Sequence, residues 1–146
     1  MIVMQYANNG SLLSYLGQNI NRLTWKLKLH RLQGIAHDLR QLHHEGLVHC
    51  DLHSGNILLH CYYEYQEHAM EKDFLINSFI CDLGLSQSVN LCRQNPTIQD
   101  ILPFIAPEVF NTCKFTQKPD IYSFSIIMYL MATGEPPFRD REFNRD

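Results

Sequence analysis

The residues best suited to chemistry lie in a polar loop, His49–Asn56, between two short apolar runs, Leu47–Val48 and Ile57–Leu59. Asp51 and Asn56 both belong to this loop, and strands formed by the apolar runs would hold it in place. A carboxylate can take a proton, and carboxylate and amide oxygens can both bind a cation. We therefore expect these two side chains to converge on one point.

Two further short motifs follow the loop along the chain. Asp82-Leu83-Gly84 is an acidic turn that comes directly after the strand-like run Phe79–Cys81, and its glycine leaves the backbone free to bend. Ala106-Pro107-Glu108 ends a long stretch without hydrophobic periodicity. Each motif is common by chance, but all three in this order, with the loop set between apolar runs, are not.

These motifs resemble the landmarks of the eukaryotic protein kinases, and residues 47–59 are most similar to the tyrosine-kinase-like branch. That family has a catalytic loop H-R-D-L-x-x-x-N, a metal-binding turn D-F-G and a later A-P-E motif. Residues 1–12 are similar to the strand and hinge that join the two kinase lobes, and Asp120–Ser125 resembles the start of the buried helix under the catalytic loop. The matching motifs here are His49-Cys50-Asp51-Leu52 with Asn56, Asp82-Leu83-Gly84 and Ala106-Pro107-Glu108.

The resemblance implies an α+β fold of the protein-kinase type, of which residues 1–146 form a part. It implies a mostly helical C-terminal lobe with short β-hairpins and an N-terminal lobe that is largely absent. The glycine-rich loop, the phosphate-pairing lysine and its partner glutamate are expected before Met1. The expected parts are the hinge region at 1–12, the catalytic loop with flanking strands at 47–59, the activation segment at 82–108 and the buried helix at 120–133.

The same resemblance implies ATP and Mg²⁺ as cofactors and a protein Ser/Thr hydroxyl as the acceptor of the γ-phosphoryl group. Asp51 would accept or orient the hydroxyl proton, and Asn56 with Asp82 would give oxygen ligands to Mg²⁺. Backbone groups of Gln5 and Ala7 would bind the adenine edge. The other expected nucleotide contacts are the gatekeeper Met4 and, under the adenine ring, Leu58.

Several positions depart from the family pattern. Cys50 stands where an arginine usually pairs with a phosphate on the activation segment, and cysteine offers no cation for that contact. His53 stands where Ser/Thr kinases place a lysine, Leu83 replaces phenylalanine as an expected buried hydrophobe, and residues 61–72 form an expected inserted loop. The alternative function is therefore a catalytically inactive kinase fragment or pseudokinase that acts as a protein-binding module.

Hydrophobic spacing and capping residues predict three helices. Ser11 is a candidate N-cap of a short helix that Gly17 ends, and Thr24 opens a longer helix that Gly46 closes. A third helix is expected at 120–133. The long helix would bury one face whose members lie three or four positions apart: Trp25, Leu29, Leu32, Ala36, Leu39 and Leu42.

Composition limits the class of protein. The 146 residues include 12 basic and 15 acidic ones, a formal net charge of −3, which excludes a generally basic nucleic-acid binder. The five cysteines form no C-x-x-C pair and no secretory signal opens the chain, so we expect a reducing, cytoplasmic compartment. The longest apolar run, Ile121–Ala132, falls short of the roughly 20 residues that cross a bilayer. Expected partners are a protein substrate and ATP.

A crowd of histidines and cysteines between residues 43 and 61 raises the alternative of a zinc site. The segment His44–His49 misses the H-E-x-x-H spacing by one residue and contains Gly46, which stops a helix. We therefore expect His49 to pack in the core, and His43 and His44 to lie at a solvated helix end.

Overall fold

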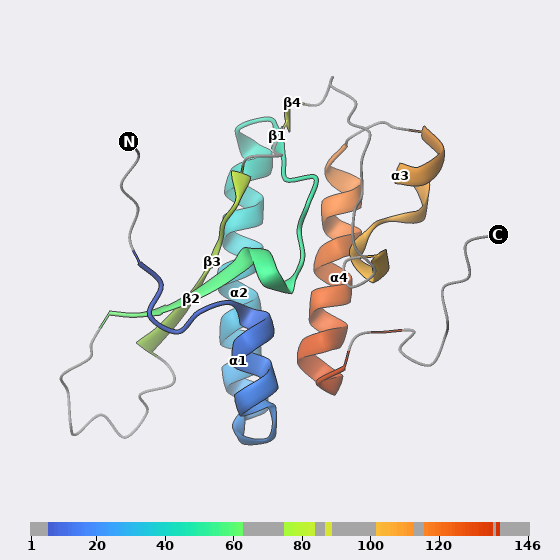
Figure 1. Cartoon of the computed structure of the whole chain (residues 1–146). Coiled ribbons are helices and arrows are strands. Elements are labelled where there is room, and N and C mark those ends of the chain that lie inside the picture. Colours follow the sequence, from blue (N-terminus) through green and yellow to red (C-terminus); the bar gives the residue numbers. More distant parts are fainter. Residues whose placement is uncertain are drawn as a thin grey trace.

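The computed structural model describes residues 6–62, 75–83, 87–88, 102–112, 116–135 and 137, and Figure 1 shows their arrangement. The helices are α1 (Leu12–Asn19), α2 (Trp25–His44), α3 (Pro107–Thr112) and α4 (Gln117–Thr133). The strands are β1 (Leu47–Val48), β2 (Ile57–Cys61), β3 (Ile76–Ile80) and β4 (Gln87–Ser88). Short 3₁₀ turns lie at Ile20–Arg22, Ser54–Asn56 and Leu102–Phe104.

The long helix α2 lies at the centre of the described fold, with the β2–β3 hairpin on one side and α4 running beside it on the other (Figure 1). One hydrophobic cluster joins these three layers. Its fully buried members include Ile35 on α2, Leu59 on β2 and Ile127 on α4. This mainly helical arrangement with short antiparallel strand pairs confirms the α+β class.

The predicted N-caps of helices α1 and α2 both form. The Ser11 hydroxyl accepts a hydrogen bond from the Ser14 N–H, and the Thr24 hydroxyl accepts one from the Leu27 N–H, each at 3.3 Å. Gly46 takes the left-handed conformation, φ 71°, just after α2, as a C-terminal glycine should. Gly17 does not adopt that conformation, so it fails to end α1, which continues to Asn19.

The face of α2 that the hydrophobic pattern selects is only partly correct: Leu32 and Leu42 pack against the hydrophobic cluster, but the first turns of the predicted face are exposed. Trp25 is 59% exposed and Leu29 is 50% exposed, although Leu39 is buried as expected. The buried stripe also has helical spacing but contains two basic residues, which hid it from a search for apolar positions. Its members are Leu27, Lys28, Arg31, Ile35 and Leu39.

The two buried basic residues on α2 use their long apolar stems as core and their heads as hydrogen-bond donors. Lys28 Nζ donates to the carbonyl of Ala132 at 3.3 Å, which ties α2 to the last turn of α4. Arg31, 0% exposed, donates to the carbonyl of Ile76 at the start of β3. Because each head meets a main-chain carbonyl, burial of these charges is compatible with the fold.

Strands β2 and β3 pair antiparallel, with Ile57 opposite Ile80 and Cys61 opposite Ile76. The predicted strand at 79–81 thus starts earlier and ends one residue sooner. In the second pair, β1 lies antiparallel to β4. Cys61 belongs to β2 rather than to the expected inserted loop, and residues 63–72 of that loop lie outside the described residues.

Helix α4 begins and ends with clear signals. The Thr116 hydroxyl accepts from the Lys118 N–H at 3.4 Å, and Gly134 takes φ 84° just past the last residue. The helix therefore starts at Gln117, slightly before the predicted Asp120, and ends at the predicted Thr133. Within the described ranges, none of the helices is both long and apolar enough to cross a membrane.

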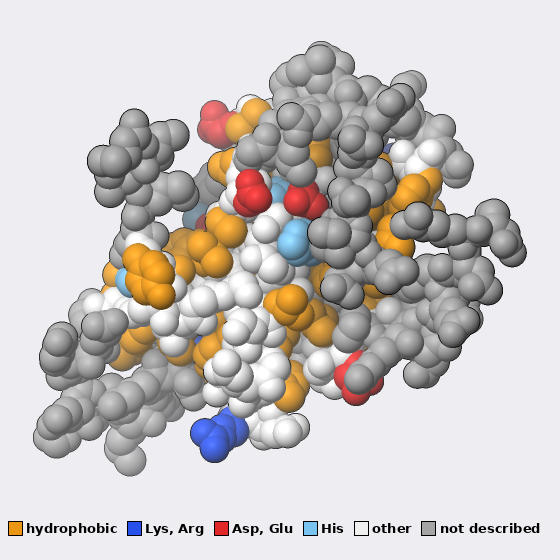
Figure 2. Space-filling model, viewed as in Figure 1, with side chains coloured by type: hydrophobic (Ala, Val, Ile, Leu, Met, Phe, Trp, Pro, Cys, Tyr) orange, Lys and Arg blue, Asp and Glu red, His pale blue; other side chains and the backbone are white. Residues whose placement is uncertain are grey.

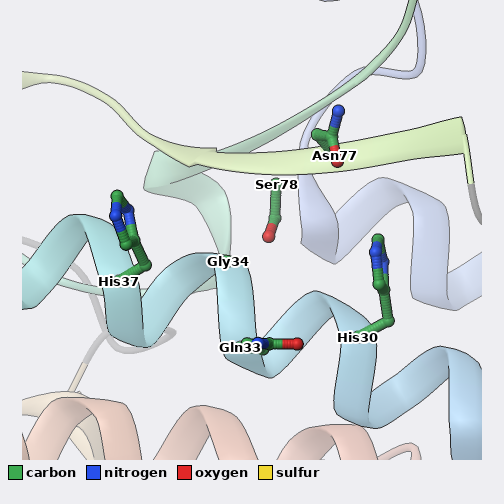
Figure 3. Close-up of a pocket in the computed structure, with 6 residues that line it drawn as sticks. All are labelled: His30, Gln33, Gly34, His37, Asn77 and Ser78. Carbon is green, nitrogen blue, oxygen red and sulfur yellow. The ribbon is translucent and has the colours of Figure 1, made fainter.

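Helix α2 and strand β3 approach closely at Gly34. The Ser78 side chain points from β3 toward Gly34 (Figure 3), and its hydroxyl donates to the carbonyl of Arg31 at 2.8 Å. A Cβ atom added at Gly34 would lie 2.6 Å from Ser78 Oγ, so only glycine fits there without a shift. A polar cavity of about 300 Å³ borders this contact and is lined by His30, Gln33, Gly34, His37, Asn77 and Ser78.

We expect Gly34→Ala to lower the free energy of unfolding by about 1–3 kcal/mol, the usual range for overpacking. The loss should be smaller when Ser78→Ala is also present, because the hydroxyl that clashes is gone. Gly17→Ala is the matched control, since nothing lies within 4 Å of its added Cβ atom. Chemical denaturation of the three variants checks this, and equal losses at Gly34 and Gly17 would contradict it.

Candidate active site

A carboxylate on α4 holds the loop between β1 and β2. Asp120 is 2% exposed and accepts hydrogen bonds from the backbone N–H groups of His49 at 2.8 Å and Cys50 at 3.1 Å. At the end of α2, His43 Nε2 lies 2.8 Å from Asp120 Oδ2. Three partners around one buried carboxylate therefore join α2, α4 and the loop, and they fix the backbone just before Asp51.

Two non-glycine residues beside the site take left-handed backbone conformations, Cys50 with φ 69° and Asp82 with φ 60°. This region costs roughly 1–2 kcal/mol for an L-residue, so each bend needs support from its surroundings. Asp120 supplies that support at Cys50. The bend at Asp82 carries Leu83 away from the hydrophobic cluster, and Leu83 is 51% exposed, so its expected burial is wrong.

The structure brings Asp51 and Asn56 together. Asn56 Nδ2 donates to the main-chain carbonyl of Asp51 at 2.9 Å and to its carboxylate Oδ2 at 3.2 Å. The N–H of Asp51 in turn donates to His49 Nδ1 at 3.2 Å. The His49 ring is fully buried, as expected, and its Nε2 lies 3.0 Å from the carbonyl of Cys81. The Asp51 backbone is thus fixed, with its side chain partly open to solvent.

The turn at Asp82 is joined to Asn56 by hydrogen bonds of the neighbouring residue, Cys81. The N–H and the thiol of Cys81 both meet the carbonyl of Asn56, at 2.9 Å and 3.2 Å. Burial raises the pKa of the Cys81 thiol and the Asp82 carboxylate raises it further, so the thiol stays protonated and donates. Figure 2 shows acidic side chains and a histidine gathered on one face of the molecule.

The donor chemistry of this face fits Mg²⁺. The Asn56 amide nitrogen is engaged with Asp51, which leaves its carbonyl oxygen as the free ligand atom, and the Asp82 carboxylate is exposed. Among the described residues no group of three or more His, Cys, Asp or Glu could hold a metal ion by itself. Mg²⁺ usually takes one or two protein oxygens and completes its shell with water and phosphate, so two oxygen ligands are compatible with such a site.

The segment before α1 lies along β2. Asn9 N–H donates to the carbonyl of Leu59 at 3.1 Å, the Leu59 N–H returns to the carbonyl of Gly10 at 2.8 Å, and Ser11 bridges to Leu58. Two of the residues expected around adenine, Ala7 and Leu58, therefore belong to adjoining segments. The other two, Met4 and Gln5, lie outside the described residues, as does most of the expected activation segment.

Sequence reasoning missed the partnership of His43 with Asp120. The His43 side chain is only 11% exposed and binds the carboxylate, so the expectation of a solvated position was wrong for it, whereas His44 is 80% exposed as expected. The signal available was an acidic residue in the first turn of an otherwise apolar helix. An aspartate there needs partners once the helix is buried.

Comparison with known proteins agrees with this geometry. The sequence profile of the family described as protein tyrosine and serine/threonine kinase matches residues 1–145. The RGS domain-containing serine/threonine-protein kinase A of Dictyostelium discoideum is 34% identical over 92% of the chain, which covers 11% of that protein. The serine/threonine-protein kinase TNNI3K of Rattus norvegicus is 35% identical over 94% of the chain, which covers 15% of it.

A third relative, the calcium/calmodulin-regulated receptor-like kinase 2 of Arabidopsis thaliana, is 32% identical over 94% of the chain, which covers 30% of that protein. The chain thus spans between about a tenth and a third of the length of these relatives. It belongs to the protein kinase family, which confirms the resemblance carried by its three motifs.

We expect Asp120→Ala to lower the free energy of unfolding by about 3–5 kcal/mol. The substitution removes the carboxylate that the His43 imidazole and the main-chain N–H groups of His49 and Cys50 share. Asp38→Ala is the matched control, since Asp38 accepts one main-chain bond, from Ile80, at a partly exposed position. That variant should lose about 0.5–1.5 kcal/mol. Urea titration of both decides the matter, and equal losses would contradict the central role of Asp120.

Proposed function

We propose that this chain provides the catalytic-loop half of a protein kinase active site, which transfers the γ-phosphoryl group of ATP to a Ser/Thr hydroxyl of a protein. The observation that carries the proposal is the convergence of Asp51, Asn56 and the Asp82 turn on one face, braced by Asp120. The names of the relatives, which include several serine/threonine kinases, support the choice of acceptor.

The chemistry follows from what each group can do. Asp51 orients the acceptor hydroxyl and takes its proton, with its backbone fixed by His49 and its carboxylate by Asn56. The Asn56 and Asp82 oxygens would hold Mg²⁺, and the ion would supply positive charge to neutralise the nucleotide phosphates. Phosphoryl transfer depends mainly on such positioning and charge neutralisation, so a rigid loop is the main protein requirement.

Ala7 and Leu58, which belong to adjoining segments, are proposed to contact adenine together with Met4 and Gln5. The alternative is a kinase-family module that binds a protein without catalysis. Cys50 favours it, because the cysteine cannot pair with a phosphate as the usual arginine would. Phosphotransfer by a complete domain that carries these residues separates the two functions, because a protein-binding module without catalysis would show none.

In a complete domain that carries these residues, Asp51→Ala and Asp82→Ala should each abolish phosphotransfer. Asp82→Ala should also weaken Mg·ATP binding because it removes a metal ligand, whereas Asp51→Ala should bind nucleotide nearly as the parent does. Radiolabel transfer to a protein substrate and calorimetric nucleotide binding give the two readings. Full activity in the Asp51 variant would overturn the assignment of the base.

Expressed alone, the 146 residues should show no measurable ATP-dependent phosphorylation of a generic protein substrate. They contain no glycine-rich phosphate loop, and comparable charge contacts are worth about 10³–10⁵ in rate. The exposed apolar side chains of Trp25, Leu29, Met128 and Tyr129 should also promote self-association. A monodisperse monomer with turnover of about 1–100 s⁻¹, the range of kinases, would contradict this expectation.

A further inference from the structure

His53 is held in place on both sides of its ring. Its Nδ1 accepts a hydrogen bond from the N–H of Gly55 at 3.1 Å, which closes the 3₁₀ turn Ser54–Asn56. Its ring lies 6.3 Å from the ring of Phe104, tilted by 58°, and its side chain is 18% exposed. A residue fixed this firmly presents its other ring nitrogen in one direction.

Gly55 leaves the space that this ring needs. A Cβ atom added at Gly55 would lie 2.8 Å from His53 Cε1 and 2.9 Å from Nδ1. The φ of Gly55 is outside the left-handed region, so its backbone does not require glycine. The close approach of the imidazole is therefore the structural reason for glycine at this position.

The contact with Gly55 also sets the tautomer of the ring. A main-chain N–H can only donate, so Nδ1 must be the unprotonated nitrogen and the proton of the neutral ring lies on Nε2. That Nε2 is 3.8 Å from Oδ2 of Asp51. The distance exceeds a hydrogen bond, but contacts in catalytic sites are often long without substrate and shorten in the complex.

We propose that His53 is a positioning residue for Asp51. Held by Gly55 as the Nε2–H tautomer, it directs that N–H at Oδ2, the oxygen that Asn56 also binds at 3.2 Å. With Oδ2 engaged from two sides, Oδ1 is the oxygen left to face the acceptor hydroxyl. This inference rests on the proposed function, because it assigns a task to His53 only if Asp51 is the base.

The competing interpretation is that His53 only caps the turn. The two roles use different ring nitrogens, and two substitutions separate them. In His53→Asn the amide oxygen replaces Nδ1 and can still accept from the Gly55 N–H. The shorter side chain, however, leaves no donor in place of Nε2–H beside Asp51. In His53→Gln the longer amide places a donor near the Nε2 position and gives up the cap.

The first measurement is spectroscopic and uses the complete domain that carries these residues. Imidazole ¹⁵N–¹H correlation spectra at neutral to slightly alkaline pH should show His53 as the Nε2–H tautomer. Asp51→Asn should shift the His53 Nε2–H signal, and Gly55→Ala should remove the single tautomer. A protonated Nδ1, or a His53 signal that does not respond to Asp51→Asn, would overturn the proposal whatever the activity of the domain.

The second measurement is phosphotransfer kinetics in the complete domain. His53→Asn and Gly55→Ala should each lower kcat by about 10²-fold, the typical effect of a misplaced catalytic group, with the KM for ATP unchanged. His53→Gln should recover most of that loss, and Gly17→Ala should match the parent. Activity kept in His53→Asn and lost in His53→Gln would show that the cap alone matters and would refute the positioning role.

The outcomes distinguish the two levels of proposal. If Asp51→Ala retains full activity, the proposed function fails. If Asp51→Ala is inactive while both His53 variants behave as the parent, the function stands and the role of His53 is refuted.

Discussion

The structure depends on one buried carboxylate. Asp120 lies 2% exposed in the first turn of α4, and its partners are a histidine at the end of α2 and two main-chain N–H groups of the loop after β1. Burying a lone charge is strongly unfavourable, so these partners cannot be lost one at a time without a large penalty. The same contacts that satisfy Asp120 hold Cys50 in its left-handed conformation, and this bend aims Asp51 outward.

From that anchor the site is built by a chain of hydrogen bonds among side chains and main-chain groups. The His49 ring accepts a hydrogen bond from the Asp51 N–H and contacts the carbonyl of Cys81. The Cys81 N–H donates to the carbonyl of Asn56, and the Asn56 amide donates to the Asp51 carboxylate. The two contacts of Cys81 join the loop to the end of β3, so the catalytic loop and the acidic turn at Asp82 share one rigid frame. Such a frame suits phosphoryl transfer, where positioning contributes more than covalent chemistry.

Helix α2 shows where pattern reasoning fails. Its ends were predictable, because Thr24 and Gly46 act on neighbouring backbone through local rules. Its buried face was predictable only in part, because Lys28 and Arg31 are polar by type and yet lie inside. Their burial depends on carbonyl groups of α4 and β3 far along the chain, which no helical period reveals.

The sequence by itself determined the family, the α+β class and the pairing of Asp51 with Asn56, since these rest on short motifs and on spacings of a few residues. Tertiary structure alone decided that Asp120 meets Cys50 across 70 positions and that His43 is buried against that carboxylate. It also decided that the His53 ring turns its Nε2 toward Asp51. The reason is physical: local propensities act through adjacent backbone, whereas the partner of a buried charge is chosen only when distant segments pack together.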